Sequence, residues 1–327
     1  MSSADPQLLP EERSQLLPMA PGRLWVQDRG PIPAGAQAEP ALLLLHSLLV
    51  TGWDFRRFGD PLAAAGRRVL TPDLFGCGNS DRPAAQDTSG YGFEWHAELL
   101  ARMLDRLEVP VVDLLGHGYG ASIAIHLARR LTQPEARHRV QLRRLILIAP
   151  YLFPVDAPIA LPGPMPHLRR AWSWVGFAPL VFRTVFRKAD LRRFLQRSLH
   201  QPELLEPAKP PDQQALCSDV EVYWDRLCRS GGLEAVQAML EQIDTLAEHT
   251  RDGVRERLHE AARSLSTPTM IVWGDDDRIV PTRFAQRATA LIPDAELRII
   301  EACGHAPHRE RPEALREVLD AFDRRMR

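Results

Sequence analysis

The sequence predicts an α/β fold with a doubly wound, mostly parallel sheet and a helical lid insertion. Short continuous apolar runs such as residues 41–45, ALLLL, are typical of strands that are covered on both faces. These runs alternate with segments of helical periodicity over nearly the whole chain, which indicates a parallel sheet flanked by helices. The alternation is interrupted between about residues 154 and 243, where a proline-rich stretch precedes an amphipathic helical pattern.

The expected elements follow one another in a regular order. Helices are expected around residues 55–66 (FRRFGDPLAAAG) and 94–108 (EWHAELLARMLDRLE). Residues 111–130 (VVDLLGHGYGASIAIHLARR) are typical of a strand, a sharp turn and a helix. Strands are expected within the following segments: 23–30, 41–45, 67–76, 109–116, 138–150, 268–277 and 295–305.

The same pattern divides the chain into three parts. Residues 1–22 are expected to form an N-terminal arm, residues 23–153 and 244–327 an α/β core, and residues 154–243 a helical lid. Aromatic residues recur at helical spacing in the lid, so we expect most of them to pack internally and some to line a pocket. These aromatic residues are Trp172, Trp174, Phe177, Phe182 and Phe186.

The composition argues against several classes of function. A formal net charge of -1 over 327 residues does not suggest a protein that binds nucleic acid or an acidic membrane surface. The longest apolar run near the start is too short to span a bilayer, and the first twenty residues lack the pattern of a signal peptide. The four cysteines have neither metal-ligand nor disulfide spacing. We therefore expect a cytoplasmic protein without metal or cofactor that acts on a small molecule.

The turn at residues 116–120, GHGYG, departs from a known motif at its centre. In the nucleophile elbow, Gly-x-Ser-x-Gly, the central serine attacks the substrate from a tight turn between a strand and a helix. Here the central residue is Gly118, which has no side chain. Gly116 and Gly120 still allow close packing of strand and helix, and the turn still presents N–H groups at a helix N-terminus.

Four separated segments resemble the α/β-hydrolase family, in the family's order. The match runs from about Leu24 to the C-terminus. The segments are LLLLHSLLVTGWDF (42–55), VLTPDLFGCGNSDRP (69–83), LLGHGYGAS (114–122), and the pair IVWGDDDRIVP (271–281) and EACGHAPHRERPE (301–313). The resemblance implies the fold already expected from the alternation of strands and helices.

The resemblance also implies roles for individual residues. The acid of a catalytic triad falls at Asp277, and the general base falls at His305, whose tautomer the acid would fix. The oxyanion donors would be the N–H groups of Tyr119 and Leu48. The loop that carries Leu48 contains His46 and, in place of the usual glycine, Ser47.

Other polar residues near these segments are assigned supporting roles. Ser47 and Ser122 are the hydroxyls nearest to Gly118 in the sequence; Ser122 is expected to point away, and Ser47 is kept as an alternative nucleophile. Glycine at position 118 also excludes the dehalogenase and epoxide hydrolase branches, which would place aspartate there. Loop-capping, turn or structural roles are expected for Asp73, Asn79, Ser80, Asp81, Asp275, Asp276 and His117, and His308 has no counterpart in the family pattern.

Three functions fit these observations. The main prediction is an atypical enzyme in which a His305–Asp277 dyad and a backbone oxyanion hole catalyse a non-hydrolytic or base-only reaction on a small, largely apolar molecule. Lyase, cyclase, isomerase and cofactor-free oxygenation reactions belong to this class. The first alternative is a non-catalytic pseudo-hydrolase that binds a small molecule or a partner. The second is a serine ester hydrolase whose nucleophile has been replaced by Gly118.

Overall fold

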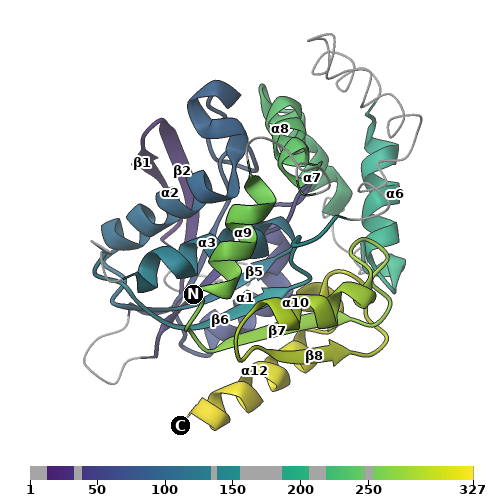
Figure 1. Cartoon of the computed structure of the whole chain (residues 1–327). Helices are drawn as coiled ribbons and strands as arrows, with labels where there is room; N and C mark the ends of the chain where they lie inside the picture. The colour runs from purple at the N-terminus through teal and green to yellow at the C-terminus, as the bar shows by residue number, and fades with distance from the viewer. Residues whose placement is uncertain are drawn as a thin grey trace, which may run out of the picture.

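The computed structural model is built around one central sheet flanked by helices (Figure 1). It describes residues 13–32, 39–133, 138–154, 186–205, 219–244, 246 and 253–326. The sheet has eight strands in the order β1-β2-β4-β3-β5-β6-β7-β8. The strands are β1 (Gln15–Met19), β2 (Gly22–Arg29), β3 (Ala41–Leu45), β4 (Val69–Pro72), β5 (Val111–His117), β6 (Gln141–Ile148), β7 (Thr269–Gly274) and β8 (Glu296–Ile300).

The sheet is parallel from β4 to β8, and β1 and β2 pair antiparallel at one edge. All five residues of β3 are buried, and so are the last six of β5, because helices cover both faces of the sheet. The continuous apolar runs in the sequence therefore mark central strands. This arrangement confirms the predicted α/β fold class.

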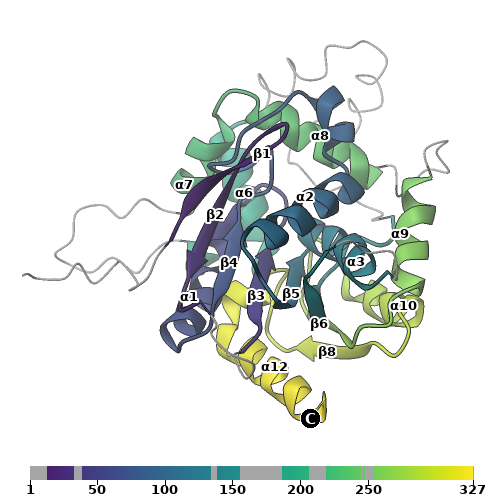
Figure 2. The ribbon, with the colours of Figure 1, turned by 90° about the vertical axis from the view of Figure 1, so that its left-hand side faces the viewer.

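Helices form a layer on each face of the sheet (Figures 1 and 2). On one face lie α2 (Phe93–Arg106), α3 (Tyr119–Thr132), α9 (Val254–Arg263) and α10 (Ala285–Leu291). Within this layer, α3 packs against both α2 and α9. On the other face α1 (Arg56–Ala64) packs against α12 (Pro312–Met326). The short helix α11 (Pro307–Glu310) precedes α12. The described 3-10 segments are η1 (Gly52–Phe55), η2 (Ala85–Tyr91), η3 (Pro202–Leu205) and η4 (Thr282–Phe284).

Part of the expected N-terminal arm belongs to the sheet instead. Residues 15–19 form β1, in which Leu17 is paired with Leu24 of β2. Only Leu17 and Met19 of this strand are buried, because an edge strand buries alternate residues on one face. With only two buried positions, the sequence of this edge strand cannot be distinguished from that of a segment that lies outside the sheet.

The structure describes part of the expected lid. It contains α6 (Lys188–Ser198), α7 (Asp219–Leu227) and α8 (Gly232–Asp244), which lie together at the upper right of Figure 1. Phe186 is buried, and its ring centroid lies 6.1 Å from that of Trp224 in α7. The other aromatic residues expected to pack in the lid, Trp172, Trp174, Phe177 and Phe182, lie outside the described residues.

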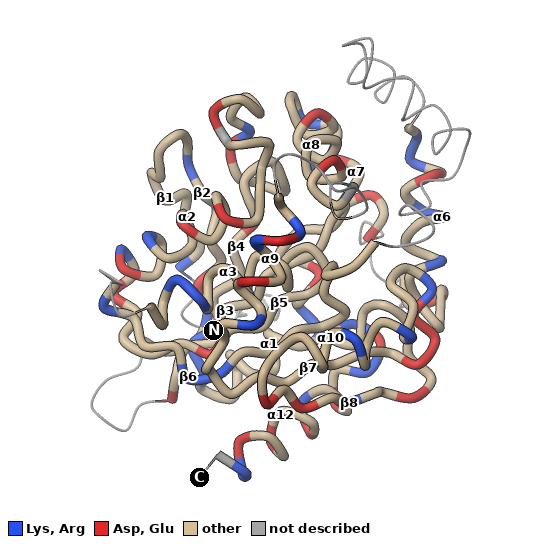
Figure 3. The backbone as a smooth tube through the Cα atoms, viewed as in Figure 1, with Lys and Arg blue, Asp and Glu red and all other residues tan. Residues whose placement is uncertain are grey.

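Charged residues are interspersed over the described helices and loops (Figure 3). Among the described residues, no helix is both long enough and apolar enough to cross a membrane.

Candidate active site

The candidate site lies where the order of the strands reverses direction. β3 has β4 on one side and β5 on the other, and ligands of open α/β sheets bind beyond the carboxyl ends of strands at such a point. Leu45, the last residue of β3, is paired with Gly116 of β5. Two residues beyond this pair, the two chain segments bring Ser47 beside Gly118.

Gly118 lies in the sharp turn between β5 and α3, with φ 53° and ψ −110°. Side chains rarely adopt a positive φ, and glycine does so without a steric penalty. A Cβ atom at Gly116 would lie only 2.5 Å from Gly120 O and 2.6 Å from Ala121 Cα. The turn therefore has the close strand–helix packing that the sequence pattern predicts.

The side chain of Ser47 occupies the space next to Gly118. A Cβ atom at Gly118 would lie 3.0 Å from Ser47 Cβ, 3.3 Å from Tyr151 Cε2, and far inside the van der Waals distance of Ser47 Oγ. Ser47 Oγ lies 3.4 Å from the backbone N of Tyr119, which donates to it, and the Ser47 hydroxyl also hydrogen-bonds Tyr151. Ser47 is 5 % exposed. A hydroxyl from the loop after β3 therefore stands beside the turn after β5.

His46 holds the loop that carries Ser47. The backbone N–H of Leu74 donates to His46 Nε2 at 2.9 Å, so Nδ1 carries the proton and donates to the carbonyl oxygen of Ser47 at 2.8 Å. Burial lowers the pKa of His46, which keeps the ring neutral in this role. Leu48, the next residue after Ser47, is 2 % exposed. His46 thus fixes the backbone that presents the Leu48 N–H.

His305 and Asp277 form a buried hydrogen-bonded pair. They lie in the loops that follow β8 and β7, and His305 Nδ1 is 2.8 Å from Asp277 Oδ2. The other oxygen, Oδ1, accepts the N–H groups of Ile279 and Val280, each at 2.8 Å. Because the carboxylate accepts a hydrogen bond from Nδ1–H, the proton of the neutral ring is on Nδ1 and Nε2 is the basic nitrogen. Nε2 is buried and has no hydrogen-bond partner among the described residues.

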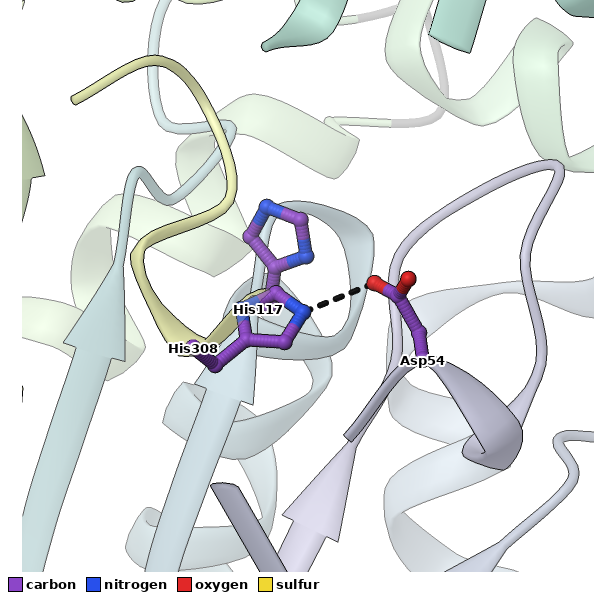
Figure 4. Close-up of side chains that lie close together, drawn as sticks. All are labelled: Asp54, His117 and His308. Atoms are coloured by element: carbon purple, nitrogen blue, oxygen red, sulfur yellow. Dashed lines mark hydrogen bonds and ion pairs between the residues drawn. The ribbon is translucent and has the colours of Figure 1, made fainter. Parts of the chain in front are cut away.

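A second histidine–aspartate pair, His308 with Asp54, lies beside His117 (Figure 4), whose ring centroid is 4.5 Å from that of His305. His308 Nε2 is 2.7 Å from Asp54 Oδ2. Asp54 Oδ1 accepts from Arg309 at 2.9 Å and from the Tyr223 hydroxyl at 2.8 Å. Burial would raise the pKa of Asp54, but His308 and Arg309 outweigh it and hold that pKa well below its usual value. Asp54 is therefore a buried carboxylate whose charge is balanced.

This second pair anchors the His305 loop and is poorly suited to a metal ion. Asp54, His117 and His308 offer ligand atoms that lie within 4.8 Å of one another. The Arg309 guanidinium already binds Asp54, however, and would repel a second cation in this buried place. Burial lowers the pKa of His117 well below its usual value, and its Nε2 donates to the backbone oxygen of His305 at 2.9 Å.

Several contacts of the site were not expected from the sequence. Tyr151 follows β6, next to β5 in the sheet, and reaches the space over Gly118. The only signal for Tyr151 is its place just after a buried strand.

Ser122 does not face Gly118; its hydroxyl donates to the backbone oxygen of Tyr151 at 2.9 Å. Asp73 caps loops as expected, with Oδ1 accepting the N–H of Gly52 and Oδ2 that of Asn79, each at 2.8 Å.

A small cavity lies between some of these groups. It has a volume of about 20 Å³, which is room for one water molecule. Ser47, Leu48 and His305 line it from the core, and Phe194 and Leu199 line it from α6 and the residue after it. Apolar side chains therefore line part of the cavity, and Ser47, His305 and the Asp54–Arg309 ion pair are among its polar groups.

Comparison with known proteins finds similarity to hydrolases. The model of the alpha/beta hydrolase family matches residues 42–318. The 2-hydroxymuconate semialdehyde hydrolase of Pseudomonas putida is 27 % identical over 324 residues, which are 97 % of this chain and 96 % of that protein. The 2-hydroxy-6-oxo-2,4-heptadienoate hydrolase of Pseudomonas putida strain F1 is 28 % identical over 78 % of each chain.

A solved structure shows the same fold. The crystal structure of a point mutant of a meta-cleavage product hydrolase superposes with a TM-score of 0.68 at 19 % identity, and the match covers 95 % of this chain and 98 % of that one. At this identity the likeness concerns the fold alone.

The main functional prediction from the sequence, a non-hydrolytic or base-only reaction, is wrong in the light of these relatives. Both relatives in sequence are named as hydrolases, so the hydrolase alternative accounts for them better. The prediction took the missing elbow side chain as a loss of hydrolytic chemistry. It could not use the register of β3 and β5, which sets a hydroxyl beside Gly118. The match to the family model over residues 42–318 shows that the chain belongs to the alpha/beta hydrolase family.

Proposed function

We propose that this chain is a hydrolase that cleaves a small substrate at a carbonyl carbon by serine-hydrolase chemistry. In this proposal Gly118 stands at the position where the family pattern has its nucleophilic serine. The observation that carries the proposal is the buried His305–Asp277 pair: His305 Nε2 is unpartnered among the described residues, and His305 lines the same cavity as Ser47 and Leu48. Similarity to a 2-hydroxymuconate semialdehyde hydrolase over nearly the full length supports it.

Each group of the site has a role in this chemistry. His305 Nε2 takes a proton from the attacking hydroxyl and returns it to the leaving group, and Asp277 holds the ring and stabilises the imidazolium that forms. The N–H groups of Leu48 and Tyr119 receive the negative charge that develops on the carbonyl oxygen. His46 keeps the first of these donors in place through the carbonyl group of Ser47.

The substrate class follows from the lining and from the relatives. Leu48, Phe194 and Leu199 favour an apolar chain. The relatives' names contain small hydroxy-oxo acids, so we propose a small oxo compound of this kind. The insertion would cover the site as a lid, because the carbonyl oxygen of Ser198 in α6 accepts the N–H of His305 at 2.7 Å. A cytoplasmic location and the absence of a cofactor stay predictions.

The proposal is tested by hydrolysis assays on a short activated ester and on 2-hydroxy-6-oxo-2,4-heptadienoate. His305→Ala should lower kcat/KM by roughly 100- to 10,000-fold, since positioned proton transfer is worth that much. Asp277→Asn should also lower it, because the carboxamide favours the wrong tautomer. The control is His138→Ala, a histidine that contacts Asp105 in α2, away from the site. Equal rates for the wild type and His305→Ala on every substrate that is turned over would contradict the proposal.

A further inference from the structure

We infer that Ser47 supplies the nucleophilic hydroxyl, from the loop after β3 and not from the elbow. This inference rests on the proposed hydrolase function and goes beyond it, because it names the attacking atom. The starting point is the sheet register, which pairs Leu45 with Gly116 and so aligns Ser47 with Gly118. Gly118 has no side chain, and the nearest side-chain atoms to the space above it belong to Ser47.

Positions 47 and 118 compete for one space. A Cβ atom at Gly118 would overlap Ser47 Oγ and lie 3.0 Å from Ser47 Cβ. Two non-bonded atoms cannot approach so closely, so a side chain at one position requires a smaller residue or a shifted loop at the other. Serine at 47 and glycine at 118 are therefore a matched pair. The Ser47 hydroxyl comes from the loop after β3, but it lies in the space that a side chain at position 118, in the turn after β5, would occupy.

The oxyanion donors suit either position of the hydroxyl. In the elbow arrangement, one donor is the N–H of the residue after the nucleophile, and the other comes from the neighbouring loop. With Ser47 as the nucleophile, Leu48 is the residue after it, and Tyr119 belongs to the neighbouring loop. The same two N–H groups are used with their roles exchanged. In the free protein the Tyr119 N–H donates to Ser47 Oγ at 3.4 Å, so it lies near the place that the carbonyl oxygen would take once the substrate carbon is bonded to Oγ.

The base is also within the same small space. His305 Nε2 is buried without a hydrogen-bond partner among the described residues, and His305 and Ser47 line the same cavity of about 20 Å³. A buried acceptor left unpaired costs free energy, and satisfying it offsets the hydrogen bond to Tyr151 that the Ser47 hydroxyl gives up when it turns toward Nε2. The Ser47 side chain can reach other directions by rotating between staggered χ1 wells. Catalytic hydrogen bonds are often long before substrate binds and shorten in the complex.

The reaction then balances with water as the second reactant. The Ser47 hydroxyl proton moves to His305 Nε2 as Oγ bonds to the substrate carbonyl carbon, and the carbonyl electrons move to the oxygen held by Leu48 and Tyr119 N–H. Collapse of this intermediate breaks the bond to the leaving group, which takes the proton from His305. Water then gives a proton to His305 and attacks the acyl carbon, and the Ser47 oxygen leaves with that proton.

Covalent labelling locates the nucleophile. A fluorophosphonate probe should modify the wild type, and peptide mass spectrometry should place the adduct on Ser47. Ser47→Ala should abolish labelling and lower turnover of the activated ester by roughly a hundredfold or more. Ser264→Ala is the control, because Ser264 directly follows α9, its hydroxyl donates to the backbone oxygen of Ala261 at 2.8 Å, and it does not line the cavity. It should keep both labelling and turnover.

An exchange of the two residues tests the shared space. Gly118→Ser alone should gain no activity and should lower the melting temperature, because its Cβ meets Ser47. The double variant Ser47→Gly/Gly118→Ser should regain stability relative to Gly118→Ser and carry the label on residue 118. Circular dichroism and thermal melting of every variant establish that it is folded.

The possible failures are distinguishable. If Ser47→Ala is labelled and turned over as the wild type while His305→Ala is inactive, the hydrolase proposal stands and the assignment of Ser47 is wrong. If both variants keep full activity, the hydrolase proposal itself is contradicted. If Gly118→Ser is as stable and active as the double variant, the two positions do not share one space.

Discussion

The glycines around the elbow turn meet two different physical needs. Gly118 has φ 53°, a conformation that side chains rarely adopt. Gly120 has an ordinary φ, but a Cβ atom there would lie 2.6 Å from His46 O and still closer to Leu45 O. The first glycine is needed for the direction of the backbone and the second for the approach of helix to strand. The second also touches the loop that carries Ser47.

Gly120→Ala should therefore affect both stability and activity. The methyl group must push α3 away from the end of β3, and we expect a loss of at least about 2 kcal/mol in the free energy of unfolding. The displaced loop should also lower kcat. The matched control is Gly66→Ala, which has φ 96° but no atom within 4 Å of the added Cβ. It should cost about 1 kcal/mol and leave kcat unchanged, as urea unfolding and the ester assay would show. Equal losses in both variants would refute the close-packing explanation.

Single residues were predictable where a local motif marks them. The resemblance indicated both Asp277 and His305, and the structure brings them to 2.8 Å of each other. The Asp54–His308 contact was not predictable, because these residues are 254 positions apart and each belongs to a helix of four residues, too short to show a periodic pattern. Tyr151 was missed because it too lies outside any periodic pattern. Local patterns identify residue types and turns, whereas these contacts depend on which loops the sheet brings together.

At the scale of helices and strands, the sequence indicated which elements form but not the order of the strands in the sheet. Apolar runs indicated the strands, and their alternation with helices indicated a parallel sheet. Nothing in these runs shows that β4 lies outside β3, or that residues 15–19 add an edge strand. The position of Ser47 beside Gly118 depends on that order, since it requires β3 and β5 to be neighbours.

Buried charges contribute to the contact of α7 with the core, beside buried Val220 and Tyr223. Asp219 in the first turn of α7 binds Arg309 of α11 and also Arg56 of α1, the latter at 2.6 Å. Asp219 is 5 % exposed and Arg309 is 2 % exposed. Two residues along α7, Glu221 binds Lys188, and the two side chains are 45 % and 40 % exposed. The helix thus offers one buried and one exposed ion pair for comparison.

Asp219→Asn should be far more destabilising than Glu221→Gln. Removing one charge of a buried pair leaves the cations uncompensated, so we expect a loss of about 3–5 kcal/mol in the free energy of unfolding. The exposed pair should change it by less than about 1 kcal/mol. Urea unfolding followed by tryptophan fluorescence would measure both. A loss for Asp219→Asn no larger than that for Glu221→Gln would show that the buried pair does not hold α7 on the core.

The whole molecule buries several histidines outside the candidate site. His96 in α2 and His126 in α3 are 1 % and 7 % exposed, and they lie where these two helices pack together. Burial lowers the pKa of His96 to about 4 and that of His126 to about 3. Both rings are therefore neutral in the folded state at a pH where the unfolded chain would protonate them.

The folded protein should lose stability as the pH falls from about 7 to 5. Between pH 6.5, the ordinary pKa of histidine, and the lowered values, the unfolded chain binds protons that the folded chain does not, so the free energy of unfolding decreases with decreasing pH. A pKa of about 3 makes the share of His126 about 2 kcal/mol at pH 5. Asp54 and Asp113 have pKa values lowered from 3.8, so their contributions to the pH dependence of stability lie below pH 5. Urea unfolding at about pH 7.5 and about pH 5 should show that His126→Gln loses about 2 kcal/mol less than the wild type between the two conditions. Equal losses would mean that His126 is protonated in the folded protein at the lower pH, and that the interface between α2 and α3 admits water to a ring that the structure shows as buried.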